Sequence, residues 1–375
     1  MSVSIATSCV LGVTAYDVEV EVHLANGLPA FTIVGLPDAA CRESQARVRS
    51  AIHQSGFRFP PQKITVNLAP ADIRKEGTGF DLPIAIAILT ATDQIEKNPD
   101  SKIAFCGELA LDGRVRAISG VLPRAVDFRN TGKAFVLPRE NANEVVCVSD
   151  ADLYCVRSLK EAVDLISGES PGSFRIKSDS YNVVTEDVSD ADFSEVKGQV
   201  LAKRGIEVAV SGGHNVLLLG PPGSGKTMLA KRIPSILPPM SVSESLETTT
   251  IHSVAGALTK EKSFLTQRPF REPHHTISDV ALIGGGAHPK PGEISLAHNG
   301  ILFMDEFPEF RRNVLEVLRQ PLEEGRVTVS RAAQTVVFPA QFNLIAAMNP
   351  CPCGYLSHDR QSCTCSPKQI RTYLN

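Results

Sequence analysis

The sequence predicts an α/β protein with two α/β domains in succession. Short β-rich runs alternate with helical stretches along the 375-residue chain. In the second half, apolar runs lead into glycine turns and then helices, as a parallel sheet requires. Residues 169–192 lie between the two patterns and are polar, with little apolar surface to bury. We therefore expect domains at 1–168 and 193–375, joined by a linker.

The runs also predict individual elements. In the first domain we expect strands at 18–24, 31–34, 63–68 and 134–137 and helices at 38–54 and 81–91. In the second domain, the run 216–219 predicts a buried parallel strand, and the runs 301–304 and 342–348 predict two more strands. A further helix is expected from residue 367 onward.

The composition excludes several classes of protein. No apolar stretch approaches the roughly 18 residues that a membrane-spanning helix needs, and the N-terminal residues lack a secretory signal. We therefore expect a cytoplasmic protein without membrane contact. Lys and Arg number 38 against 41 Asp and Glu, so no general positive field attracts nucleic acid, and any such contact must be local.

The most specific motif follows the run 216–219. It is a phosphate-binding loop, GxxxxGKT, in the strand–loop–helix context that this motif demands. Glycines let successive backbone N–H groups point at phosphate. Lys226 is expected to reach the β and γ phosphates of ATP, and the Thr227 hydroxyl to ligate Mg²⁺. The candidate nucleotide-binding residues are Gly220, Pro221, Pro222, Gly223, Ser224, Gly225, Lys226, Thr227 and Met228. The alternative is a glycine-rich turn without a ligand.

A weaker nucleotide signal lies upstream of this loop. Gly198 and Gln199 come just before the first helix of the second domain, and we expect them to line the adenine.

Two later strands are expected to bring polar side chains to the same phosphates. The run 301–304 ends at Asp305 and Glu306, where the carboxyl end of a strand places both carboxylates beside the nucleotide. Asp305 is expected to hold the water shell of Mg²⁺, and Glu306 to polarise the attacking water. The run 342–348 ends at Asn349, whose amide would bond that water or the γ-phosphate. The alternative is an Asn that caps the turn before Pro350.

Four of the nine cysteines form a cluster, Cys351, Cys353, Cys363 and Cys365. Two pairs of thiolates suit tetrahedral Zn²⁺, although the one-residue spacing within each pair is tighter than usual. A Cys₄ iron–sulfur centre and free or redox-active cysteines are the alternatives, and His358 is a substitute ligand. A metal here would be structural and would stiffen a loop close in sequence to Asn349.

Four further segments point to a known family. They are residues 268–276, 284–286, 291–300 and 319–332. Together they resemble the magnesium-chelatase-like AAA+ proteins, and the long N-terminal domain is similar to that of the YifB/ComM branch. The resemblance covers essentially the whole chain. It implies that residues 193–375 form a P-loop AAA+ αβα sandwich with a parallel sheet.

The resemblance also implies an activity and partners. Members of the branch are implied to be hexameric ATPases that encircle DNA and drive branch migration during natural transformation, so we expect a homo-hexamer and single-stranded or branched DNA. The candidate DNA-binding residues are Arg268, Arg271, His274, His275, Arg326 and Arg331, on segments that could face a central pore. The alternative is that these arginines pair with acidic neighbours across subunit contacts.

The first domain resembles the Lon-protease-like fold, of the ribosomal S5 domain 2-like type, through residues 75–83 and 107–120. Where the protease has its nucleophilic serine, this sequence has Gly79. Near the position of the protease's lysine it has Val121, Leu122 and Pro123. Because acyl transfer by such a dyad needs a hydroxyl and a base, we expect a proteolytically inactive domain that serves assembly or DNA contact.

Several functions fit these residues. The leading interpretation is an ATP-driven DNA translocase or branch-migration helicase, and the main alternative is a chelatase-type remodeller that acts on a protein partner for metal insertion. An ATP-dependent protease and a regulatory nucleotide-binding module are the others. A complete AAA+ module also has a helical lid, whose arginines complete a neighbouring active site. No segment here is long enough to be that lid, so we expect a fragment or a partner that supplies it.

Overall fold

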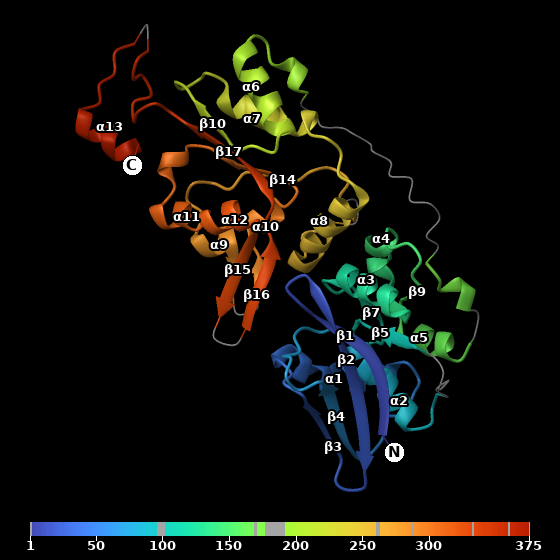
Figure 1. Cartoon of the computed structure of the whole chain (residues 1–375). Coiled ribbons are helices and arrows are strands. Elements are labelled where there is room, and N and C mark those ends of the chain that lie inside the picture. The colour runs from blue at the N-terminus through green and yellow to red at the C-terminus, as the bar shows by residue number, and fades with distance from the viewer. Residues whose placement is uncertain are drawn as a thin grey trace. The chain divides into compact units, whose positions relative to one another are not determined.

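The computed structural model describes residues 2–95, 102–168, 171–176, 192–259, 263–286, 289–331, 334–358 and 361–374. The chain forms two compact units, Met1–Asn182 with Ser253–Phe264, and Val183–His252 with Leu265–Asn375 (Figure 1). The domain limits expected at 168 and 193 stay a prediction, because most of the residues between them lie outside the described ones.

The first unit is built on a seven-stranded mixed sheet in the order β3-β4-β2-β1-β5-β8-β9. Its strands are β1 (Ser2–Leu11), β2 (Thr14–Ala25), β3 (Ala30–Val34), β4 (Lys63–Ala69), β5 (Ile103–Phe105), β8 (Ala134–Pro138) and β9 (Leu153–Val156). A small separate ladder joins β6 (Glu108–Leu109) to β7 (Val115–Arg116). The helices are α1 (Ala39–Gln54), α2 (Asp81–Ala91), α3 (Val121–Thr131), α4 (Ala142–Val145) and α5 (Leu159–Ile166), with 3₁₀ turns η1 (Arg139–Asn141) and η2 (Pro171–Ser173).

The elements expected in this unit form within a few residues of their predicted bounds, but β1 was not predicted. Its sequence has three serines and one alanine, which alternate with Val3, Ile5, Thr7 and Cys9. The strand forms because β2 pairs with it along its whole length, from Ser2 opposite His23 to Leu11 opposite Thr14. The two strands therefore form a hairpin, joined by Gly12 and Val13.

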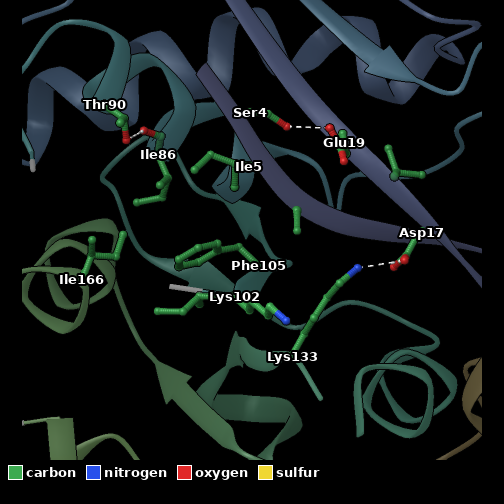
Figure 2. A pocket seen from close by; sticks show the side chains of 13 residues that line it. Ser4, Ile5, Asp17, Glu19, Ile86, Thr90, Lys102, Phe105, Lys133 and Ile166 are labelled. Atoms are coloured by element: carbon green, nitrogen blue, oxygen red, sulfur yellow. Dashed lines mark hydrogen bonds and ion pairs between the residues drawn. The ribbon is translucent and has the colours of Figure 1, made fainter. Parts of the chain in front are cut away.

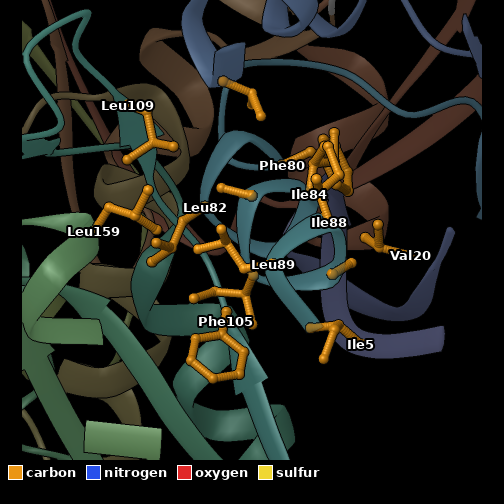
Figure 3. Packing of buried hydrophobic residues seen from close by; sticks show 14 of the residues in the cluster. Ile5, Val20, Phe80, Leu82, Ile84, Ile88, Leu89, Phe105, Leu109 and Leu159 are labelled. Carbon is orange, nitrogen blue, oxygen red and sulfur yellow. The ribbon is translucent and has the colours of Figure 1, made fainter. Parts of the chain in front are cut away.

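The core of the first unit surrounds α2. Every residue of this helix is buried, since its sequence is apolar on all sides. Figure 3 shows Leu82 and Leu89 of α2 beside Phe105 of β5. The one acidic residue of the helix, Asp81, accepts hydrogen bonds from Arg47 (2.6 Å) and from the backbone N–H of Leu109 (3.1 Å). Burial raises the pKa of Asp81, and these bonds oppose the rise.

The second unit contains a four-stranded parallel sheet in the order β10-β17-β14-β11. Its strands are β10 (Val216–Leu219), β11 (Phe270–Arg271), β14 (Gly300–Met304) and β17 (Phe342–Met348). Two small antiparallel ladders accompany it, β12 (Gly284–Gly285) with β13 (Lys290–Pro291), and the hairpin β15 (Arg326–Arg331) with β16 (Gln334–Pro339).

Short helices surround this sheet (Figure 1). They are α6 (Val200–Ser211), α7 (Lys226–Arg232), α8 (Val242–Ala255), α9 (Asp279–Ile283), α10 (Glu293–Leu296), α11 (Arg312–Glu316), α12 (Arg319–Glu324) and α13 (Pro367–Leu374), with 3₁₀ turns η3 (Phe193–Glu195), η4 (Ile233–Ile236) and η5 (Phe307–Glu309). The last residues of α8, from Ser253, group with the first unit. None of the helices in the described part of the chain has the length and apolar character needed to cross a bilayer.

The burial of β10 corrects the sequence prediction. The strand is parallel, as expected, but Leu217 and Leu219 are 56% and 61% exposed. β10 lies at the edge of the sheet. Only the face that carries Val216 and Leu218 packs into the apolar cluster with Ile206 of α6. In contrast β14, which lies inside the sheet, is buried along its whole length.

Two buried histidines hold segments of the second unit together. Nδ1 of His298 accepts the backbone N–H of Gln341 at 3.0 Å, so its proton resides on Nε2, which lies 3.3 Å from Glu247. Nε2 of His252 lies 3.0 Å from the carbonyl oxygen of Leu296 and therefore donates to it. Burial lowers the pKa of both rings, and Glu247 opposes the change at His298.

The lowered pKa values predict a loss of stability in acid. Below the unfolded pKa of about 6.5 the unfolded chain binds more protons than the folded one, so stability falls as the pH drops. Each histidine lowers the free energy of unfolding by at most about 1.4 kcal/mol for each pH unit of acidification. We expect His298→Gln, whose amide oxygen can still accept the N–H of Gln341, to reduce this pH dependence.

Thermal unfolding followed by circular dichroism at about pH 7.5 and about pH 5.5 checks the expectation. His23→Gln is the matched control, because His23 is exposed in β2 and its replacement is expected to leave the pH dependence unchanged. If the Tm of His298→Gln and that of His23→Gln fall by the same amount between about pH 7.5 and about pH 5.5, the role of His298 is contradicted.

Candidate nucleotide-binding site

The loop between β10 and α7 has the backbone shape of a phosphate cradle. Gly223 and Gly225 adopt φ values of 75° and 86°, which side chains other than glycine rarely adopt. Gly220 is needed for space, since a Cβ there would lie 2.9 Å from Oγ of Ser224. The loop curls because these three positions carry no side chain, and its backbone N–H groups can turn inward.

Lys226 lies at the centre of this loop. Its Nζ donates hydrogen bonds to the carbonyl oxygens of Gly220 (2.7 Å) and Pro221 (3.0 Å) and to Oδ1 of Asn349 (3.1 Å). Burial lowers the pKa of Lys226, and Asp305 opposes this change. The ammonium group is therefore held in the cradle by neutral oxygens, which leaves its charge available to an anion.

The carboxylates of the next strand reach the same place. Oγ1 of Thr227 donates to Oδ2 of Asp305 at 2.6 Å, while Oδ1 of Asp305 accepts the backbone N–H of Glu306 at 2.9 Å. Glu306 has a φ of 52°, in the left-handed region. These residues, the loop and Asn349 line a cavity of about 350 Å³. The structure thus brings Lys226, Thr227, Asp305, Glu306 and Asn349 together.

The cradle fits a triphosphate with its Mg²⁺. Oγ of Ser224 is buried and has no hydrogen-bond partner among the described residues, and a buried polar atom of this kind is expected to have a partner in the working protein. Thr227 and Asp305 supply the hydroxyl and carboxylate oxygens that Mg²⁺ prefers. These residues therefore suit the phosphates and the ion for which the sequence predicts them.

Gln199 also reaches the loop. Its side-chain amide donates to the carbonyl oxygen of Ser224 at 3.1 Å, and both Gly198 and Gln199 adopt positive φ values, 69° and 53°. This geometry places Gln199 beside the phosphate loop. Its expected contact with adenine stays a prediction.

One residue of the site was assigned another role from the sequence. Nδ1 of His275 lies 3.2 Å from Oε2 of Glu306, and its ring packs edge-on against Phe310. His274 stacks on His275 with ring centroids 4.1 Å apart. The sequence gives no signal for this pairing, because His275 and Glu306 follow different strands of the sheet and their spacing matches no motif.

The other candidate DNA-binding residues lie away from this pair. Arg268 bonds Glu244 at 3.0 Å, and Arg271 bonds Glu293 through two nitrogens at 2.6 and 2.7 Å. Arg326 begins the β15–β16 hairpin and bonds Glu324 at 3.0 Å. Arg331 ends β15, and its side chain lies outside the described residues. Three of the four arginines therefore have acidic partners within the chain, and their contact with DNA stays a prediction.

The four clustered cysteines converge. Their Sγ atoms all lie within 4.8 Å of one another, and the sulfurs of Cys351, Cys353 and Cys363 are separated by 3.4 to 3.6 Å. A Zn–S bond of about 2.3 Å places tetrahedral sulfurs roughly 3.8 Å apart. The backbone N–H groups of Cys353 and Cys365 donate to sulfurs of the cluster, and backbone hydrogen bonds lower the pKa of Cys353 to about 5. The donor set can hold a metal such as zinc.

In the first unit, the neighbourhood of Gly79 is filled. A Cβ on Gly79 would lie 3.1 Å from Cδ1 of Ile118 and 3.8 Å from Nη2 of Arg124. Arg124 is itself buried and donates to the carbonyl oxygen of Ser8. The absence of protease activity stays a prediction, and these contacts are those of a packed core.

The first unit also has a cavity of about 350 Å³ between β1, β2, α2 and β5. Figure 2 shows that two polar pairs line it, Lys133 with Asp17 and Ser4 with Glu19, each at 2.8 Å. Because these groups already bond one another, the cavity presents a weaker case for a charged ligand than the cradle around Lys226.

Comparison with known proteins agrees with this arrangement. Residues 192–375 match the profile of the magnesium chelatase subunit ChlI, and residues 20–141 match a second profile for the same subunit. A protein called YifB from Salmonella typhimurium is 46% identical over 376 aligned residues, which cover all of this chain and 73% of that protein. The competence protein ComM of Haemophilus influenzae is 47% identical over 97% of this chain and 71% of its own length.

A more distant relative matches a shorter stretch. Lon protease 2 of Bacillus subtilis is 25% identical over 172 residues, or 41% of this chain and 30% of the protease. The two profiles, the long matches and the phosphate cradle agree on one family. The chain belongs to the YifB/ComM family of magnesium-chelatase-like AAA+ proteins, with a Lon-protease-like domain followed by a P-loop AAA+ domain.

Proposed function

We propose that this protein is an ATP-hydrolysing motor that acts on DNA, a hexameric branch-migration helicase or translocase of the ComM type. The observation that carries the ATPase part is the hydrogen bond between Thr227 and Asp305. It joins the phosphate loop to the strand that ends in Glu306 and leaves a cavity beside both. A turn without a ligand has no reason to assemble these groups.

The residues divide the work as follows. Lys226 binds the β and γ phosphates, while Thr227 and Asp305 hold Mg²⁺, which neutralises charge on the phosphates when it is bound. Glu306 orients and polarises the attacking water as general base. Asn349, whose amide already contacts Lys226, binds the γ-phosphate or the attacking water. It therefore loses a hydrogen-bond partner when the γ-phosphate leaves.

Replacing Glu306 separates binding from hydrolysis. We expect Glu306→Gln to bind MgATP with nearly unchanged affinity and to lower kcat by about a hundredfold or more, because the amide cannot accept the proton of the water. Phosphate release and equilibrium binding of nucleotide measure the two effects. Glu309→Gln is the control, since this exposed carboxylate lies three residues further on, in η5. Wild-type turnover by Glu306→Gln indicates a purely regulatory nucleotide site.

The proposed action on DNA is supported by the names of similar proteins and by charged residues of the β15–β16 hairpin. One relative is named competence protein ComM, and residues of this chain are also 28% identical over 165 residues to the DNA replication licensing factor mcm7 of Schizosaccharomyces pombe. Within the chain, the β15–β16 hairpin begins at Arg326, which is exposed. A ring of six such hairpins gives a basic surface that suits the phosphates of a strand passing through it.

The pairing of His275 with Glu306 connects the two parts. While Nδ1 of His275 lies 3.2 Å from the carboxylate, Glu306 is withheld from the attacking water. Since His275 belongs to the segment expected to face DNA, a phosphate that attracts His275 releases Glu306, and DNA then raises the rate of hydrolysis. The driving force is the contact that the imidazole gains with a phosphate oxygen when it leaves the carboxylate of Glu306.

Substitution of His275 tests this connection. We expect His275→Ala to raise hydrolysis without DNA several-fold and to reduce its stimulation by DNA. His274→Ala is the control, because His274 stacks on His275 but bonds Thr276 instead of Glu306. Phosphate release is measured with single-stranded, duplex and four-way-junction DNA. Equal behaviour of the two variants refutes the role of His275.

The second candidate is a chelatase-type remodeller that acts on a protein partner. The observation in its favour is that both matching profiles are those of the magnesium chelatase subunit ChlI. The same ATPase measurement distinguishes the candidates. Stimulation by at least one of the three DNA structures supports the DNA motor, and no stimulation by any of them favours the remodeller.

A further inference from the structure

The loop that carries the cysteine cluster packs directly on the phosphate loop. Gly354 follows the first cysteine pair, and its N–H donates to the carbonyl oxygen of Cys351 at 2.9 Å. A Cβ on Gly354 would lie 2.4 Å from Cδ and 2.6 Å from Cγ of Pro222. The backbone of the cysteine loop therefore rests against the ring of Pro222, with no room for a side chain between them.

A second connection runs through Asn349. This residue lies two positions before Cys351, which is completely buried, and its Oδ1 accepts the hydrogen bond from Lys226. A movement of Cys351 is thus transmitted through one intervening residue, Pro350, to the amide that contacts the lysine. Since proline restricts the backbone on both of its sides, little of this movement can be absorbed between them.

A third connection follows the second cysteine pair. The helix α13 begins two residues after Cys365, and its Tyr373 is partly buried. Burial raises the pKa of the Tyr373 phenol, and the backbone of Asn349 and the carboxylates of Glu309 and Glu306 also act on it, so this end of the helix lies near the cradle. The two cysteine pairs therefore lead to the cradle from opposite ends of the loop.

Backbone hydrogen bonds hold parts of this loop, from Gly354 to Cys351 and from Cys353 and Cys365 to sulfurs of the cluster. Cys353, Cys363 and Cys365 are partly exposed, and the free cysteines form no disulfide in the described residues. One tetrahedral ion bonded to all four sulfurs adds four strong bonds between the two cysteine pairs. Metal binding of this kind contributes directly to the order of the segment.

We propose that the four cysteines bind one Zn²⁺ ion and that this ion sets the affinity of the adjacent cradle for MgATP. The inference deepens the proposed function and rests on its nucleotide site. Zinc holds Gly354 against Pro222 and fixes Asn349 beside Lys226, so the cradle is ordered before the nucleotide arrives. Because linkage is reciprocal, MgATP then tightens zinc binding by the same factor.

The test compares nucleotide affinity with and without zinc. Binding of a non-hydrolysable ATP analogue with Mg²⁺ is measured by calorimetry on wild-type protein as loaded with zinc, after removal of zinc by a chelator, and after zinc is added back. We expect one zinc per chain, a Kd for the analogue about tenfold higher in the stripped protein, and recovery on reloading. Competition with a chromogenic chelator is expected to show zinc held about tenfold more tightly when the analogue is present.

Two variants accompany this comparison. Cys363→Ser with Cys365→Ser removes two ligands, and its affinity for the analogue is expected to match that of the stripped protein and to be unaffected by zinc. Cys147→Ser is the control. This half-buried cysteine lies in the first unit and bonds the carbonyl oxygen of Glu144, a bond that serine keeps. We expect it to bind zinc and analogue as the wild type does.

Replacement of the contacting ring tests the route of the coupling. In Pro222→Ala the surface that meets Gly354 is lost while all four cysteines remain. We expect zinc to bind without nucleotide as in the wild type, and the difference in Kd for the analogue between loaded and stripped protein to fall below about twofold.

The outcomes separate this inference from the proposed function. Equal Kd values for the analogue in loaded and stripped wild type overturn the coupling while the nucleotide site stands. Failure of the wild type to bind zinc overturns the metal centre. Failure of both forms to bind the analogue overturns the nucleotide site itself. A full zinc effect in Pro222→Ala overturns the contact with Gly354 as its route.

Discussion

The hydrogen bond between Thr227 and Asp305 depends on a single geometric constraint, the parallel pairing of β10, β17 and β14. In this register Leu219 lies opposite Met348, and Met304 opposite Ala346. The three strands therefore end at one edge of the sheet. Asp305 and Asn349, which follow β14 and β17, therefore line the same cavity as the loop that follows β10, although the three segments are far apart in the chain. A shift of one residue in this pairing would turn each side chain to the other face.

Preorganisation is the common feature of the site. Lys226 is bonded to two backbone carbonyl oxygens and to Asn349, and Glu306 is held in a left-handed backbone conformation with its carboxylate on His275. Such a conformation is unfavourable for a residue other than glycine and persists where the surroundings enforce it. The fold thus holds Lys226 in position before the ligand is present, whereas the carboxylate of Glu306 lies beside His275.

Both units are built from strands and helices, but their glycines have different surroundings. In the first unit, Gly79, which is expected from the sequence to occupy the position of the protease's serine, lies near the buried Arg124 within a packed core. In the second unit, small residues at Gly220, Gly223 and Gly225 leave space instead of filling it. Glycine therefore lies in a closed core in one unit and in an open cradle in the other, because the surrounding side chains occupy the volume around Gly79 and leave it free beside the phosphate loop.

The sequence alone determined the elements whose cause is local: the phosphate loop, the strands that end at Asp305 and Asn349, and the fully apolar helix α2. The family was also readable from its motifs. Tertiary structure alone decided how distant segments meet: the exposure of Leu217 at the sheet edge, the approach of His275 to Glu306, and the packing of Gly354 on Pro222. Periodicity and spacing report what neighbouring residues prefer, whereas these contacts depend on which surfaces meet once the chain has closed on itself.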